Sequence, residues 1–114
     1  MLPEHDLGRL ADIHKYATRA LSHVNGMTFE QFNTSVTAID AVIHCLTVIG
    51  EAAGRLSTDA RTQFPQFDWS AMTGMRHRLV HDYGRIDYEI MWDVVQEKLP
   101  TLRDELTAFL SRIE

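Results

Sequence analysis

Mostly apolar residues recur at alternating steps of three and four along the first part of the chain. The series is Leu7, Leu10, His14, Ala17, Leu21 and Val24. This spacing places every member on one side of an α-helix, because an α-helix makes one turn every 3.6 residues. Asn25 and Gly26 follow directly and are typical of a helix end. The pattern therefore predicts a first helix that ends near residue 24.

A second and longer apolar series follows a helix-start signal. The letters TFEQ at residues 28–31 match a capping box, in which Thr28 and Gln31 satisfy each other's free backbone donors. We expect one continuous helix of about six turns, with Gly50 and Gly54 permitting close contact with a neighbouring helix. Its apolar positions are Phe32, Val36, Ile39, Ile43, Leu46, Ile49, Ala53 and Leu56.

The second half of the chain predicts two more helices. Asp68 is a good N-cap, and the helix after it should run from residue 69 to about 83. A short helical turn is expected before Phe64, because the residue that precedes a proline is pushed out of helical geometry. Asp87 can cap a last helix, whose apolar positions stay in phase across Pro100. This last segment is either one kinked helix or two nearly collinear ones.

No segment alternates with the two-residue period of a strand, and the chain contains no internal repeat. A length of 114 residues suits one hydrophobic core. We therefore predict an all-α protein, an antiparallel four- to five-helix bundle in which residues 1–114 form a single domain.

Composition narrows the class of protein further. Apolar residues make up 45% and charged residues 24% of the chain, which are ordinary values for a folded domain. No apolar run approaches the roughly 18 residues of a membrane span, and the first ten residues lack the pattern of a signal peptide. We therefore expect a cytoplasmic protein that binds no membrane. Cys45 is the single cysteine, which excludes an internal disulfide, and its apolar flanks predict a buried side chain.

The charge of the chain is unevenly distributed. The net charge is −5, which argues against a protein that coats nucleic acid by bulk electrostatics. Residues 76–85, however, contain three arginines and one aspartate, a local charge of +2 against −7 for the remaining residues. A small basic focus on an acidic protein suits the local capture of one phosphate better than long tracking along a strand.

Residues 76–83, with the sequence RHRLVHDY, concentrate groups that handle protons and phosphates. The other histidines are scattered singly, whereas His77 and His81 stand four residues apart and could both ligate zinc on a helix. No glutamate follows His77 and no third ligand is obvious nearby. A plain solvated helix face is a second alternative, although two imidazoles are unusual on such a face.

Helix geometry limits how these groups can meet. At about 100° per residue, Arg76 and Tyr83 lie roughly 20° apart, whereas His81 lies roughly 140° from Arg76 and 40° from His77. One straight helix does not display all four groups together. Either the helix loosens near Gly84, or two chains meet there and combine their groups.

The segment resembles a motif of a known family. Arg76, four residues, His81, one residue and Tyr83 are similar to the RX4HXY motif of the HepT-like toxins in the HEPN superfamily. The stretches TFEQF, IGEAAGRLS, MRHRLVHDY and VVQEKLPTL resemble the family's landmarks in order and spacing. One departure is that Gly84 and Arg85 follow the tyrosine, where relatives commonly have an aromatic residue and then a glycine. The resemblance implies a small ribonuclease that is the toxin of a toxin and antitoxin pair.

The residues themselves explain how such a ribonuclease would work. A 2′-hydroxyl of RNA attacks the adjacent phosphorus when a base withdraws its proton, and imidazole, with a pKa near ~6.5, suits that task. We assign this role to His81. The phosphorane carries extra negative charge, which the guanidinium of Arg76 can bind through two hydrogen bonds. Because the nucleophile belongs to the substrate, we expect RNA and not DNA as substrate, with no metal ion and no cofactor.

Four further residues are expected to support this chemistry. His77 would orient groups at the site directly, and Glu51 would do so by positioning Arg76. Arg78 and Arg85 would steer the RNA backbone. Cleavage also needs an acid for the leaving 5′-oxygen, and a two-fold dimer would supply a second copy of His81. We therefore expect a homodimer, which also resembles the composite site of the superfamily.

The resemblance also implies a partner and a modification. The antitoxin of this family resembles a minimal nucleotidyltransferase that transfers AMP to the tyrosine of the motif, here Tyr83. The added phosphate and base would block and repel RNA at the cleft. The alternative function is a non-catalytic helical adaptor, which would keep the fold and bind the nucleotidyltransferase without cleaving RNA.

Overall fold

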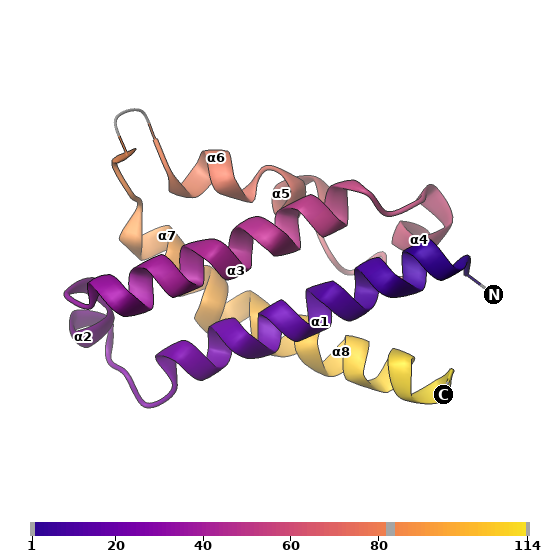
Figure 1. Ribbon diagram of the computed structural model, residues 1–114, viewed down its shortest axis with the longest axis horizontal. Helices are drawn as coiled ribbons and strands as arrows, with labels where there is room; N and C mark the ends of the chain where they lie inside the picture. The colour runs from indigo at the N-terminus through magenta and orange to yellow at the C-terminus, as the bar shows by residue number, and fades with distance from the viewer. Residues whose placement is uncertain (1, 82–83, 114) are drawn as a thin grey trace.

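The bundle is built on an antiparallel pair of long helices, α1 (Glu4–Val24) and α3 (Val36–Gly54), which lie side by side in the computed structural model (Figure 1). The structure describes residues 2–81 and 84–113. The other elements are α2 (Phe29–Asn33), α4 (Thr58–Thr62), α5 (Trp69–Thr73), α6 (Met75–Leu79), α7 (Tyr88–Asp93), the π-helical turn η2 (Val94–Lys98) and α8 (Leu99–Arg112).

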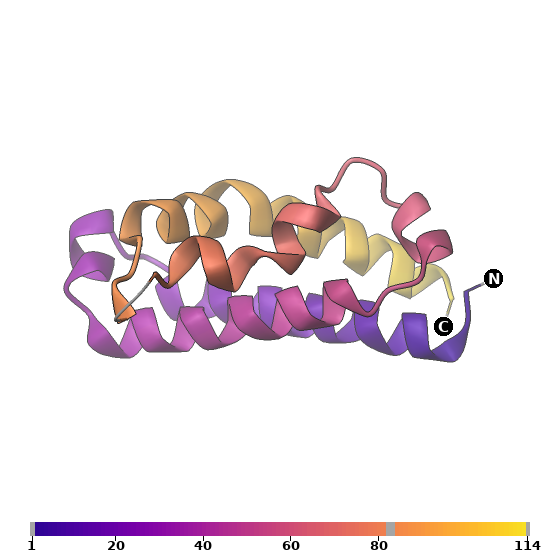
Figure 2. The same ribbon diagram turned by 90° about the horizontal axis from the view of Figure 1, so that it is seen from above.

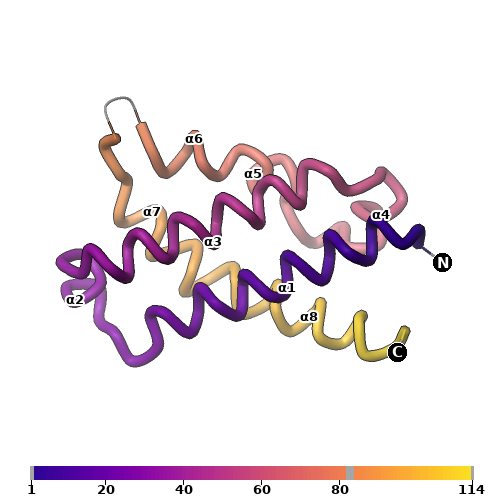
Figure 3. The backbone as a smooth tube through the Cα atoms, in the orientation of Figure 1, coloured from indigo at the N-terminus to yellow at the C-terminus, as the bar shows by residue number. Residues whose placement is uncertain are grey.

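These elements form two layers. Seen from above, α1 and α3 lie in one layer, and α5–α6 and the run α7–η2–α8 lie in the other (Figure 2). Successive long segments run in opposite directions, and α1 begins at the same end of the bundle at which α8 ends (Figure 3). The predicted all-α antiparallel bundle is therefore confirmed.

The core holds part of the stripe predicted for the first helix, but the buried face is shifted, because Ile13 and Ala20 are buried although neither belongs to the predicted series. On α1 the fully buried positions are Leu10, Ile13, Ala17 and Ala20, while Leu7 and Leu21 are half-buried. Cys45 is buried, as expected, and burial raises the pKa of its thiol. His14 does not enter the core, because its Nε2 lies 2.8 Å from the Thr107 hydroxyl at the surface of α1 and α8.

The predicted helix starts are confirmed in atomic detail. Thr28 and Gln31 form the capping box, with the Gln31 N–H donating to the Thr28 hydroxyl at 3.2 Å and the Thr28 N–H donating to the Gln31 Oε1 at 2.9 Å. Asp68 caps α5 and Asp87 caps α7. The short helical turn before Phe64 is α4. Gly26, with φ of +77°, ends the turn that follows α1, as the Asn-Gly pair predicts.

The prediction of one continuous helix from residue 28 to 56 is wrong. The helix ends at Asn33, and α3 begins after Ser35, whose hydroxyl accepts from the Ala38 N–H at 3.1 Å. Ser35 has an extended backbone, so the chain changes direction between α2 and α3. Val36 is consequently 72% exposed, although its spacing placed it on the buried stripe.

The predicted third helix, from 69 to about 83, is also divided and shorter. Gly74 separates α5 from α6, and α6 already ends at Leu79. Val80 has an extended backbone and forms an antiparallel bridge with Ile86. In the sequence, the helical spacing of apolar residues continues through Val80. The pairing of Val80 with Ile86 nevertheless ends the helix before this residue.

The last segment is continuous across Pro100. The Leu99 N–H donates to the Val94 carbonyl, five residues back, which defines the π-turn η2. Pro100 stands in the first turn of α8, where its missing N–H costs little. The helical run is therefore unbroken from Tyr88 to Arg112, and its irregularity is the π-turn η2 rather than a break at Pro100.

Two glycines of α3 allow the second layer to approach closely, as predicted. A Cβ added at Gly50 would lie 2.8 Å from the Met72 carbonyl oxygen, and one at Gly54 would lie 3.3 Å from the Thr73 Cγ2. α3 is also long and apolar enough to cross a membrane by length and composition, contrary to the expectation that no segment comes near that length. Half of its 18-residue window is buried inside the bundle, as in the core helix of a folded domain.

Candidate active site

The arginine-rich helix α6 is held on the core by two of its residues and presents the others outward. Met75 and Leu79 are 6% and 1% exposed and pack into the core. Arg76, His77 and Arg78 are exposed. The side chains expected to contact phosphate therefore start from a helix whose position is fixed by apolar packing.

After α6 the chain turns back on itself in a short hairpin-like segment. The Asp87 N–H donates to the Leu79 carbonyl at 2.8 Å, and the His81 N–H donates to the Arg85 carbonyl at 2.7 Å. Gly84 has φ of +74°, a backbone conformation that favours glycine, and its N–H donates to the His81 carbonyl. His81 thus lies outside the helix, so the angles derived for one straight helix do not apply to it. The helix thus ends at Leu79, four residues before the expected end near residue 83.

This hairpin also changes the zinc alternative, which required His77 and His81 on one helix face. His77 is on α6, whereas His81 is on the returning segment. Within residues 2–81 and 84–113, no three His, Cys, Asp or Glu side chains come together to hold a metal ion.

The imidazole of His81 faces a carboxylate. Its Nε2 lies 3.9 Å from the Asp87 Oδ2, and the two side chains are 37% and 33% exposed. The other oxygen of Asp87, Oδ1, accepts from the Ile90 N–H at 3.2 Å and caps α7. One oxygen of Asp87 is therefore held by the helix start while the other faces His81.

His81 opens into a cavity of about 390 Å³. The cavity lies between the returning segment and α2, and its lining includes residues distant in the sequence. The lining residues are Phe29, Asn33, His81, Arg85, Ile86, Asp87, Tyr88 and Glu89. We call this cavity the His81 pocket. Of Arg78 and Arg85, the two arginines expected to steer RNA, only Arg85 lines this pocket together with His81.

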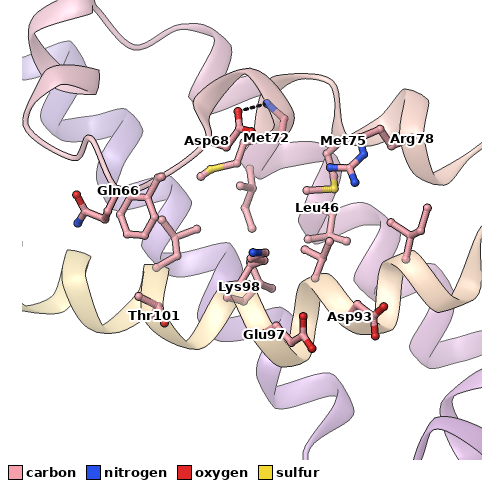
Figure 4. A pocket seen from close by; sticks show the side chains of 17 residues that line it. Leu46, Gln66, Asp68, Met72, Met75, Arg78, Asp93, Glu97, Lys98 and Thr101 are labelled. Carbon is pink, nitrogen blue, oxygen red and sulfur yellow. Dashed lines mark hydrogen bonds between the residues drawn. The ribbon is translucent and has the colours of Figure 1, made fainter.

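Arg78 lines a second and larger cavity instead. This groove of about 630 Å³ lies between α5–α6 and the run α7–η2–α8, over Leu46 of α3. In Figure 4, Arg78 lies on the α6 side, across from Asp93 and Glu97 on the opposite helix. The two basic residues are therefore on different hollows of the surface.

The other described residues that the sequence predicts for the site do not line the His81 pocket. Arg76 and His77 line neither of the two cavities, although the Val80 N–H donates to the Arg76 carbonyl at 2.9 Å, one step before His81. Among the described residues, the ion pairs do not include one between Glu51 and Arg76. Tyr83 lies outside the described residues.

Fold and site together define a class: a helical bundle that carries an exposed arginine helix followed by a histidine paired with a carboxylate. The family model described as "Ribonuclease HepT-like" matches residues 13–109. The chain therefore belongs to the HepT-like ribonuclease family, and its activity is that of a ribonuclease. The resemblance found in the sequence is confirmed.

Individual relatives cover most of the chain. It is 37% identical over 105 residues to "Putative RNase MJ0127" of Methanocaldococcus jannaschii, covering 92% of this chain and 87% of that one. It is 30% identical over 114 residues to "Putative RNase MJ1216" of the same organism, covering 99% and 94%. "Probable ribonuclease HepT" of Thermococcus cleftensis is 35% identical over 75 residues, covering 66% and 68%. No solved structure matches the chain.

Proposed function

We propose that the chain is a metal-independent endoribonuclease that acts as the toxin of a toxin and antitoxin pair in the cytoplasm. His81 withdraws the proton of an RNA 2′-hydroxyl, and the 2′-oxygen attacks the adjacent phosphorus. The bond from phosphorus to the 5′-oxygen then breaks, and that oxygen takes up a proton. The products are a 2′,3′-cyclic phosphate and a 5′-hydroxyl end.

The observation that carries this proposal is the position of His81. Its imidazole opens into a pocket, faces the Asp87 carboxylate at 3.9 Å, and has the cationic side chain of Arg85 in the same pocket. A base beside a fixed carboxylate and a phosphate-binding cation is the arrangement that cyclisation of RNA requires. Asp87 is a residue that the sequence predicts only as a helix cap.

Arg76 is assigned to the phosphorane, whose added charge a guanidinium binds through two parallel hydrogen bonds. The exposure of Arg76 on α6 leaves it free to reach a phosphate or a second chain. A two-fold homodimer would place one His81 as base and the other as acid for the leaving oxygen. The proposed antitoxin is a minimal nucleotidyltransferase that modifies Tyr83 with AMP.

The decisive experiment compares four variants on a short RNA. His81→Ala and Arg76→Ala should each lower cleavage by about 100-fold or more, because each removes a group that acts in the transition state. The matched controls, His23→Ala and Arg112→Ala, remove exposed side chains distant in the sequence and should cleave like wild type. Circular dichroism should show the same helix content in all four.

Two further readouts separate this mechanism from its alternatives. Cleavage should survive EDTA and leave a 2′,3′-cyclic phosphate, because the nucleophile is internal to the substrate. A strict zinc requirement, or wild-type rates for both His81→Ala and Arg76→Ala, would refute the assignment. A wild-type chain that binds a nucleotidyltransferase but cleaves no RNA would instead identify the non-catalytic adaptor.

A further inference from the structure

The His81 pocket contains more than the cleavage chemistry needs. A base, an acid and a charge stabiliser are the groups that cleavage uses, yet the pocket is also lined by two aromatic residues, Phe29 and Tyr88, and by Asn33. Phe29 and Asn33 belong to α2, which is about 50 residues from His81 in the sequence. The position of α2 beside His81 therefore adds an aromatic surface to the site.

This aromatic surface is held firmly. The Phe29 ring lies 6.1 Å from the ring of Trp92 on α7 in an edge-to-face arrangement, and the fully buried Phe32 lies 5.2 Å from the same Trp92. The Thr28 and Gln31 capping box fixes the start of α2. These contacts pack α2 against α7 and place Phe29 beside the pocket.

The charges of the pocket favour a neutral group over a phosphate. Asp87 and Glu89 bring two carboxylates, and Arg85 brings one guanidinium. The two carboxylates outnumber the guanidinium, so beyond the one phosphate that Arg85 can bind, the pocket suits a neutral group. A nucleobase is neutral, flat and edged with donors and acceptors. The volume of about 390 Å³ is within the range of small-ligand pockets, roughly 300–1,000 Å³.

We propose that the His81 pocket binds one unstacked base of single-stranded RNA next to the scissile phosphate. Phe29 and Tyr88 provide aromatic surface against which the base packs, and the Asn33 amide, which offers both donors and an acceptor, recognises its edge. Arg85 binds the backbone phosphate at the rim. This inference rests on the proposed function, and it makes Phe29 and Asn33 determinants of substrate choice.

The experiment uses oligonucleotides in which a single ribonucleotide fixes the point of cleavage within an otherwise deoxyribonucleotide chain. The base of that nucleotide, or of its 3′ neighbour, is replaced by an abasic residue. For the wild-type chain, removal of the base in the pocket should raise KM about tenfold, because stacking of a base on an aromatic residue contributes that much or more. Replacement by the other bases should change kcat/KM.

Two variants test whether this base contacts the pocket. In the double variant Phe29→Leu, Asn33→Ala, removal of the base should raise KM by less than about twofold, since the contact is already lost. Leucine keeps apolar packing against Trp92. The matched control is Gln96→Ala, which removes an exposed amide outside both cavities and should respond to base removal like wild type.

Binding of the same oligonucleotides with a 2′-O-methyl group at the ribonucleotide separates this inference from the cleavage mechanism. These molecules cannot be cleaved, and fluorescence anisotropy measures their affinity in the His81→Ala chain as well. A tenfold loss on base removal in the wild-type chain but not in the double variant supports the base pocket, whatever the catalytic residues are. Equal affinity for intact and abasic oligonucleotides, or an equal loss in wild type and double variant, would overturn it.

Discussion

Asp87 makes two contacts that proteins commonly divide between two residues. Oδ1 caps α7 through the Ile90 N–H, and Oδ2 faces His81 at 3.9 Å. Asparagine is as good an N-cap as aspartate but carries no charge. We expect Asp87→Asn to lower kcat about tenfold with KM and melting temperature nearly unchanged, because the imidazole loses the carboxylate that orients it. Steady-state cleavage and thermal unfolding measure these quantities.

Asp68 provides the matched control for this substitution. It caps α5 through the Ala71 N–H at 3.0 Å, and it lines the groove below α5–α6 rather than the His81 pocket. Asp68→Asn should leave kcat unchanged. If both variants cleaved at the wild-type rate, Asp87 would be a helix cap and nothing more.

Asp6 is a fully buried carboxylate outside the site. The Ser57 hydroxyl donates to its Oδ2 at 2.6 Å, and the Ser57 N–H donates to its Oδ1 at 2.9 Å. The hydroxyl contact is the main cause that lowers the pKa of Asp6 below its ordinary value of 3.8, against the opposing effect of burial. The folded pKa is therefore below the unfolded one, so this contribution to stability is complete above the unfolded pKa and is lost as pH falls through the folded pKa.

We expect Asp6→Asn to reduce the free energy of unfolding by about 2 kcal/mol at pH 7, because a hydrogen-bonded charge is replaced by a neutral amide. The difference from wild type should narrow below about pH 4, where the wild-type carboxylate becomes protonated. Urea unfolding at pH 7, 5 and 3 measures both effects. Asp40→Asn changes an exposed aspartate and serves as the control. A difference that stayed constant down to pH 3 would contradict the role given to the charge.

At the scale of elements, the sequence predicts where helices begin better than where they end. Starts depend on local side chains, and the caps at Thr28, Asp68 and Asp87 are all confirmed. Helix ends depend on contacts with distant residues. The end of α6 follows from the pairing of Val80 with Ile86, which the apolar phase does not reveal.

The site also contains residues that the sequence indicates and residues that only the fold brings together. His81 and Arg85 lie in the segment that the sequence singles out, and both line one pocket. Phe29 and Asn33 carry no sequence signal for this site, because only the packing of α2 on α7 brings them there. Asp87 was recognisable as a cap, but its second contact depends on the hairpin that places His81 opposite it.

The contact between α3 and the second layer determines where α6 lies. A Cβ at Gly50 would lie 2.8 Å from the Met72 carbonyl oxygen, and this backbone atom cannot rotate away. We expect Gly50→Ala to destabilise the protein by about 1–3 kcal/mol and to lower cleavage, because α5 and α6 must shift together. Chemical unfolding and the cleavage rate of the remaining folded protein measure the two effects.

Gly8 is the matched control within a helix. No atom lies within 4 Å of a Cβ added there, and the residue is exposed on α1. Gly8→Ala should stabilise the protein by about 0.5–1 kcal/mol through helix propensity alone, with unchanged activity. Equal stability changes for the two variants would mean that the close approach at Gly50 has no energetic consequence.

At the scale of the whole molecule, the proposed need for both an acid and a base predicts a dimer of about twice the 13.1 kDa chain mass. Mixing Arg76→Ala chains with His81→Ala chains should restore part of the activity, because the shared cleft of a heterodimer then has one His81 as base and one Arg76 as charge stabiliser and lacks only the second imidazole as acid. Light scattering measures the mass, and differently tagged chains show that heterodimers form. Tagged heterodimers without any activity would mean that each chain works alone.

The proposed target of the antitoxin is Tyr83, next to Gly84 and two residues from His81 in the sequence. An adenylyl group there would add a negative phosphate and a large base two residues from His81 in the sequence, so it should both repel and block RNA. We expect the cognate nucleotidyltransferase and ATP to add AMP to wild-type and Tyr88→Phe chains and to suppress their cleavage. Tyr83→Phe should gain no mass and stay active. Intact-mass and peptide mass spectrometry locate the label. Inhibition without added mass would show that the antitoxin works by another route, and so would a label on Tyr16 or Tyr88.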